Sequence, residues 1–81
     1  MLDNQLYIFI TVADKKNFSR AGEFLNMTQP AISQHIHALE DYYGAKLFER
    51  SSKKVELTQA GTVLYKYAQE ILSLHRVAKR A

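Results

Sequence analysis

A chain of 81 residues has room for one small domain, and a domain of this size buries too little surface to hold a deep catalytic cleft. It contains no cysteine, which excludes a disulfide framework and a thiolate metal site. The formal net charge is +3 but unevenly spread: residues 46–81 hold eight Lys or Arg and three Asp or Glu, whereas residues 1–45 hold three and five. A basic second half suits a polyanion such as nucleic acid.

The first third of the sequence predicts two helices separated by the polar residues 14–17. Asp3 is the expected N-cap of the first helix. Its apolar residues recur three and four positions apart, at Leu6, Phe9, Ile10 and Ala13. Ser19 is the expected cap of a second, short helix, whose inner face comprises Ala21, Phe24 and Leu25. Asn26 then stands where a tight turn favours a left-handed residue.

A third helix has both of its ends marked in the sequence. Thr28 is expected to start it, and Pro30 falls in the first turn, where a missing amide hydrogen is harmless. One buried stripe is predicted at steps of four, three and four: Ile32, Ile36, Leu39 and Tyr43. Gly44 follows the stripe directly and is expected to cap the helix.

Residues 47–81 predict a small hairpin and a long helix. Leu47 and Phe48 precede a polar stretch over 49–54, and Val55 and Leu57 alternate with Glu56 as in a half-buried strand. Thr58 is expected to cap a fourth helix that runs to the end. Its apolar side comprises Val63, Leu64, Tyr67, Ala68, Ile71, Leu72 and Ala78. This stripe exceeds what a small core can cover, so we expect a homodimer formed through this helix.

A short helix, a tight turn, a capped helix and a hairpin in this order predict a mainly α fold, the winged helix-turn-helix. The third helix then enters the major groove of DNA with its N-terminal end leading. Its outer face offers five candidate contacts: Gln29, Pro30, Ser33, Gln34 and His37. Gln can pair bidentately with adenine, Ser can reach a phosphate or a base edge, and the Pro30 ring can touch a thymine methyl. Asp41, at the far end, is expected to point away from the phosphates.

The cations near the hairpin are the candidate phosphate contacts. Arg50, Lys53 and Lys54 can neutralise phosphates, or one of them can enter the minor groove. Lys46 and Arg20 are weaker candidates, and the cations on the last helix are expected to decorate its exposed side or its end: Arg76, Lys79 and Arg80. Lysine-rich turns also occur for solubility alone.

Two histidines on the third helix are possible metal ligands. His35 and His37 are two residues apart on a helix, roughly 200° around its axis, so they diverge and cannot chelate one ion. A surface pair of His37 with Asp41, four residues on, is the alternative to a DNA contact for both residues. We therefore expect no metal and no cofactor.

In this order and spacing, the residues resemble the N-terminal DNA-binding domain of LysR-type transcriptional regulators. The matching pieces are Leu6 with Phe9, residues 17–21 (NFSRA) with Leu25, residues 28–33 (TQPAIS) with Ile36, Leu39 and Glu40, and then Gly44, residues 47–50 (LFER) and residues 57–61 (LTQAG). The resemblance implies a winged helix-turn-helix over 1–57, a linker helix over 58–81 that forms an antiparallel dimer contact, and a dyad-symmetric promoter site. It also implies a small-molecule effector bound only by a C-terminal domain that this chain lacks.

The same resemblance assigns roles to individual residues. It implies DNA contacts at Gln29, Pro30 and Ser33, a variable reading face at Gln34 and His37, and wing contacts at Arg50, Lys53 and Lys54. The dimer contacts expected from the apolar side of the last helix are Val63, Leu64, Tyr67, Ala68, Ile71 and Leu72. Two features depart from the family pattern. Gly22 replaces an alanine at a cost of up to about 1 kcal/mol if exposed, although it allows close helix packing, and Ser51-Ser52 brings no glycine to the wing turn.

Three classes of function can be compared with the sequence: binding of protein, catalysis and binding of DNA. A protein-binding winged helix would be expected to expose aromatic or aliphatic residues on its third helix, where this chain has Gln, Ser and His. An enzyme would need a phosphate loop, paired carboxylates or an activated nucleophile, none of which the sequence offers. Sequence-specific binding of double-stranded DNA is favoured. With neither a signal peptide nor a membrane span apparent near the start, we expect a cytoplasmic, nucleoid-associated protein.

Overall fold

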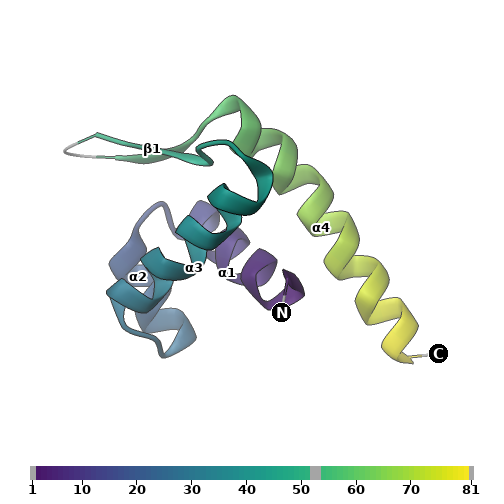
Figure 1. Cartoon of the computed structure of the whole chain (residues 1–81). Coiled ribbons are helices and arrows are strands. Elements are labelled where there is room, and N and C mark those ends of the chain that lie inside the picture. Colours follow the sequence, from purple (N-terminus) through teal and green to yellow (C-terminus); the bar gives the residue numbers. More distant parts are fainter. Residues whose placement is uncertain (1, 52–53, 81) are drawn as a thin grey trace.

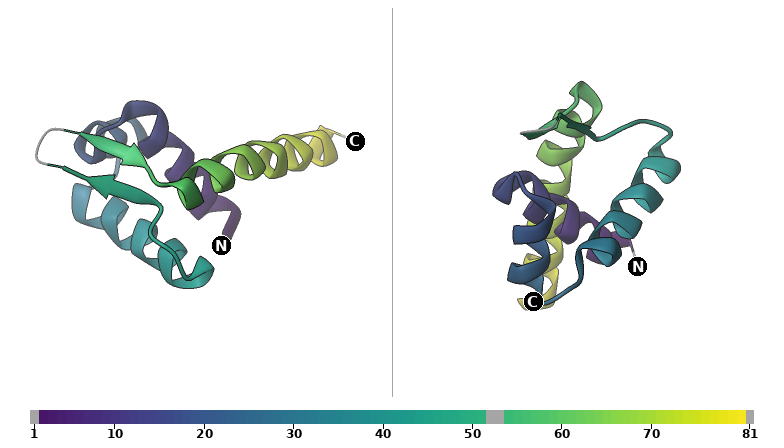
Figure 2. Two further views of the ribbon diagram at one scale, coloured as in Figure 1. Left: turned by 90° about the horizontal axis from the view of Figure 1, so that it is seen from above. Right: turned by 90° about the vertical axis from the view of Figure 1, so that its left-hand side faces the viewer.

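The computed structural model describes residues 2–51 and 54–80. The elements follow in the order α1 (Leu2–Lys15), α2 (Phe18–Leu25), α3 (Gln29–Tyr43), β1 (Phe48–Arg50), β2 (Val55–Leu57) and α4 (Gln59–Arg80). The first three helices pack into a bundle, the hairpin lies along one side of it, and α4 extends away as an arm (Figures 1 and 2). This arrangement confirms the predicted winged helix-turn-helix. Within the described ranges, no helix is long and apolar enough to cross a membrane.

Two of the predicted helix starts are wrong. Asn17, not Ser19, caps α2: its side-chain oxygen accepts a hydrogen bond from the Arg20 amide at 2.9 Å. The helix therefore begins two residues earlier than predicted, at Phe18, whose ring is buried. Asp3 lies inside the first turn of α1 rather than before it. A carboxylate there still interacts favourably with the positive end of the helix dipole.

The remaining predicted helix ends are confirmed. Thr28 Oγ1 accepts from the Ala31 amide at 3.3 Å, and Thr58 Oγ1 accepts from the Gly61 amide at 3.0 Å. Asn26 and Gly44 both adopt left-handed backbone, with φ of 59° and 67°. These residues satisfy amide and carbonyl groups that the helices leave unpaired at their ends.

The core lies between the three bundled helices, the start of α4 and the base of the hairpin. Phe9 is its centre, and its ring is 5.3 Å from that of Phe48, which in turn meets Phe18 edge-on at 5.7 Å. The other buried apolar side chains are Leu6, Ile8, Val12, Ala21, Ile32, Ile36, Leu39, Leu47, Leu64 and Ala68. The apolar contacts of Phe48 thus anchor the wing to α1 and α2.

Two residues assigned to buried faces lie at the surface instead. The Phe24 side chain is 60% exposed and stacks under the Lys15 ammonium group, 4.4 Å from the ring centroid. Tyr43 is 41% exposed, although it ends the stripe of α3 that was predicted to be buried. Ile8 and Val12, which sequence periodicity did not single out, are buried in their place.

Two glycines let backbone segments approach closely. A Cβ at Gly22 would lie 2.6 Å from the Met27 carbonyl oxygen, so the close packing expected of this glycine is present in the turn between α2 and α3. A Cβ at Gly61 would lie 2.1 Å from the Leu47 carbonyl oxygen. The first turn of α4 therefore rests directly on the backbone that leads into β1.

Candidate nucleic-acid interface

The outer face of α3 presents polar side chains on a rigid support. Gln29, Pro30, Gln34 and His37 are exposed, and Ser33 is half-buried at the margin. Ile32, Ile36 and Leu39 are fully buried on the opposite face. The five candidate contacts thus come from one helix whose orientation is set by apolar packing from behind.

Gln29 and Ser33 interact with each other at the N-terminal end of this face. The Gln29 side-chain amide donates a hydrogen bond to Ser33 Oγ at 3.1 Å. This bond leaves the Gln29 carbonyl oxygen and a second N–H free. Those two groups are the ones that a glutamine uses in a bidentate pair with adenine.

His37 pairs with Glu40, not with Asp41, which was the alternative to a DNA contact. Its Nδ1 lies 3.5 Å from Oε1 of Glu40, three residues on, and Lys46 Nζ lies 3.8 Å from the same oxygen. Lys46 is therefore placed at the C-terminal end of α3, away from the leading end of the helix. His35 and His37 belong to no group of three possible metal ligands in the part of the chain that the structure describes.

The wing is attached to the bundle by a cation. The Arg50 guanidinium lies 4.0 Å from the centroid of the Phe18 ring. Ser51 closes the turn: its amide donates to the Lys54 carbonyl at 3.0 Å, and its hydroxyl accepts from the Lys54 amide at 3.2 Å. Lys54 is exposed. Ser52 and Lys53, on which two predictions fall, lie outside the described residues.

A basic groove of about 310 Å³ joins the wing to the N-terminal ends of α2 and α3. Three cations line it, Lys16, Arg50 and Lys54, together with polar residues that include Asn17, Ser19 and Gln29. The sequence analysis did not assign Lys16, Asn17 and Ser19 to the site, because it treated residues 14–17 as a break between helices and Ser19 as a helix cap. The sequence signal that could have identified this part of the site is a cation directly before a helix N-terminus, because helix N-termini bind anions well.

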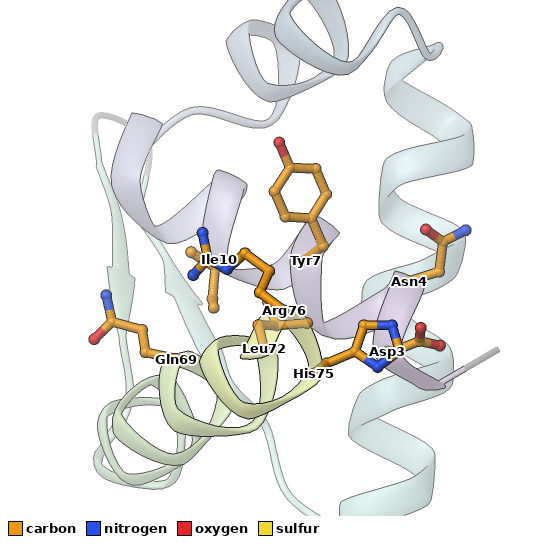
Figure 3. Close-up of a pocket in the computed structure, with 8 residues that line it drawn as sticks. All are labelled: Asp3, Asn4, Tyr7, Ile10, Gln69, Leu72, His75 and Arg76. Carbon is orange, nitrogen blue, oxygen red and sulfur yellow. The ribbon is translucent and has the colours of Figure 1, made fainter. Parts of the chain in front are cut away.

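The cations at the end of α4 lie far from this groove, along the extended arm (Figure 1). Arg76 lines a cleft between α1 and α4 instead, with Asp3, Tyr7 and Leu72 among its neighbours (Figure 3). Closer to the hairpin, the Tyr65 hydroxyl donates to the Asp14 carboxylate and ties α4 to α1. This hydrogen bond, then burial, raises the pKa of Tyr65 above its ordinary value.

The apolar residues of α4 divide between two faces. Leu64 and Ala68 are buried against their own bundle, and Leu72 is half-buried. A second face is exposed and comprises Val63, Tyr67, Ile71, Leu74 and Val77. The first three of these line a groove of about 430 Å³ with Tyr43 and Leu47. This position accounts for the partial exposure of Tyr43, whose pKa is raised by burial and by the neighbouring Tyr42.

Comparisons with known proteins agree on one family. Residues 4–62 match the family described as bacterial regulatory helix-turn-helix protein, lysR family. An HTH-type transcriptional regulator in the ibpB-leuC intergenic region of Azotobacter vinelandii is 46% identical over 76 residues, which are 94% of this chain and 53% of that protein.

Solved structures show the same fold. The CbnR_DBD–DNA complex matches with a TM-score of 0.91 and 40% identity, over 99% of this chain and 93% of that one. DarR of Vibrio fischeri in complex with DNA matches with a TM-score of 0.92 and 38% identity, over 96% of this chain and 27% of that one. The chain thus spans about half the length of the Azotobacter relative and about a quarter of DarR.

Proposed function

Because the chain belongs to the lysR family of bacterial regulatory helix-turn-helix proteins, we propose that it binds a dyad-symmetric site in double-stranded DNA as a homodimer. The observation that carries this proposal is the exposed polar half of α3 beside a groove lined by three cations. The chains that it resembles include CbnR and DarR, both solved with DNA.

Sequence is read by the leading end of α3 in the major groove. Gln29 and Gln34 are the proposed partners of adenine, and His37 lies further along the same face. Ser33 supports Gln29 and can also reach a phosphate or a base edge. The ring of Pro30 is exposed and can contact a thymine methyl group.

Affinity comes from the basic groove and the wing. Lys16 and Lys54 neutralise backbone phosphates, and Arg50 presents its N–H groups to a phosphate while its flat face rests on Phe18. Lys53 remains a proposed contact of the same kind. The wing, over 49–56, follows the backbone or enters the adjacent minor groove.

The dimer forms by antiparallel pairing of α4 with its copy. Val63, Tyr67 and Ile71 are the proposed contacts, and Leu74 and Val77 of one protomer would enter the groove beside Tyr43 of the other. Leu64 is almost fully buried and lies at the edge of the groove, so its proposed contribution to the dimer is small. Leu72 lines the cleft between α1 and α4, and its proposed contribution is also small. Ala68 has no exposed surface, so it is not among the proposed dimer contacts.

The whole regulator is proposed to place residues 1–57 on DNA, to use residues 58–81 as the dimer linker, and to bind a small-molecule effector through a separate C-terminal domain. The proposed location of the whole regulator is the cytoplasm, at the nucleoid. The family is one of transcriptional regulators, not an enzyme family. The exposed Gln and His on α3 favour a DNA partner over a protein partner.

Selection of bound duplexes from a random pool, followed by a footprint on the enriched sequence, tests this function. We expect a dyad-symmetric motif. Gln34→Ala should then lose about 1–3 kcal/mol of discrimination at one base pair in each half-site. Ser73→Ala, an exposed change on α4, is the control and should leave the motif unchanged. Failure to enrich any motif with the wild-type chain would favour the protein-binding alternative.

A further inference from the structure

The Glu40 carboxylate lies where α3, the wing and α4 meet. It projects from the last turn of α3, and its side chain is only 10% exposed. Its Oε2 accepts a hydrogen bond from the Leu47 amide at 2.9 Å, across the loop that leads into β1. One carboxylate oxygen therefore connects the recognition helix directly to the base of the wing.

The same peptide segment is attached to α4 on its other side. The Leu47 carbonyl accepts from the Thr58 amide at 3.0 Å, and the Thr58 hydroxyl donates to the Lys46 carbonyl at 2.6 Å. Gly61 brings the first turn of α4 against the Leu47 carbonyl. Residues 46–47 thus form a junction segment, which is bonded to α3 through Glu40 and to α4 through Thr58.

The hydrogen bond to Leu47 is the main compensation for burying this charge. The two other groups near the carboxylate, on His37 and Lys46, are largely exposed and farther away, so solvent screens them. A carboxylate at this end of α3 gains nothing from DNA, because phosphates repel it. Its position is explained by the link that it makes inside the protein.

In a dimer, the paired α4 helices form the frame from which the two α3 helices project. The distance between the two reading helices then depends on the angle between α3 and α4 within each protomer. We infer that Glu40 is a positioning residue that holds this angle through the junction segment and so sets the half-site spacing that the dimer prefers. The inference rests on the proposed function.

The test measures Kd for duplexes whose half-sites are moved apart one base pair at a time, at constant salt, using the 81-residue chain. Wild type should prefer one spacing. Glu40→Ala should flatten that preference by up to about tenfold, since a charge-assisted hydrogen bond contributes about 1.5 kcal/mol. Glu40→Gln retains an acceptor for Leu47 and should keep the wild-type profile. Asp41→Ala, which removes a neighbouring exposed carboxylate from the same helix, is the matched control.

The possible results distinguish the positioning role of Glu40 from the proposed DNA-binding function. Uniformly weaker or unchanged binding of Glu40→Ala at every spacing overturns the positioning role, whereas a wild-type chain that binds no spacing overturns the proposed function. Circular dichroism verifies that each variant is folded at the temperature used. If Glu40→Ala does not fold, Glu40→Asp, which draws the carboxylate back by one methylene, replaces it. A wild-type spacing profile in Glu40→Asp would then overturn the inference.

Discussion

Replacing Gly61 by alanine should destabilise the fold even though alanine is the better helix former. An added Cβ would lie 2.1 Å from the Leu47 carbonyl oxygen and 3.0 Å from Leu57 Cδ2. The first contact is with backbone, and that oxygen already accepts the Thr58 amide. The clash can be relieved only by moving the junction segment away from α4.

The magnitude follows from three opposing terms. Alanine in a helix gains about 1 kcal/mol over glycine. Overpacking costs about 1–3 kcal/mol, and loss of the bond between Leu47 and Thr58 costs about 1–3 kcal/mol if the amide is left unpaired. The net loss is about 3 kcal/mol, a large part of the total stability of roughly 4–12 kcal/mol expected for a domain of this size.

Equilibrium urea unfolding measures this loss, at one protein concentration because the proposed dimer would add to stability. The midpoint for Gly61→Ala should fall while the slope with urea stays unchanged. Ser73→Ala, on the exposed side of α4, serves as the control for helix propensity and should stay within a few tenths of a kcal/mol of wild type. A Gly61→Ala chain as stable as wild type would refute the close packing of α4 on the junction segment.

Four further predictions follow from the site. Lys54→Ala should weaken binding to every DNA sequence and lower the slope of log K against log salt by about one; an unchanged slope contradicts a phosphate contact. Arg50→Lys should keep that slope but weaken binding about two- to fivefold, because lysine lacks the planar group that stacks on the ring below; wild-type affinity would show that the stacking is dispensable. Ile71→Glu should give a monomer in analytical ultracentrifugation, and a dimer of wild-type strength would remove the exposed face of α4 from the interface. The raised pKa of Tyr65, caused first by its bond to Asp14, means that the protonated form is favoured in the folded state. Its contribution is therefore complete below the ordinary tyrosine pKa near 10 and is lost as pH rises through the raised value, so urea unfolding at rising pH should show a smaller alkaline loss for Tyr65→Phe than for wild type.

The DNA-reading face of α3 could be predicted from the sequence, but the basic groove beside it could not. Gln29, Ser33 and Gln34 follow a marked helix start, and helical periodicity places them opposite the buried stripe. Lys16 is separated from Lys54 by most of the domain, so no local pattern pairs them. Only the packing of the wing against α2, through Arg50, brings the two cations to one groove.

Local chemistry in the sequence determined the order of the elements and most helix ends, because a capping side chain acts on amides two or three residues away. Thr28 and Thr58 could be recognised for this reason, and Gly44 could be recognised because the left-handed backbone at a helix end favours glycine. The tertiary structure alone decided which apolar residues are buried, since burial depends on neighbours distant in the chain. It placed Tyr43 in a surface groove, because a hydrophobic pattern specifies a face of a helix but not the element that covers it. It also brought the Glu40 carboxylate to the Leu47 amide, a contact that a hydrophobic pattern does not specify.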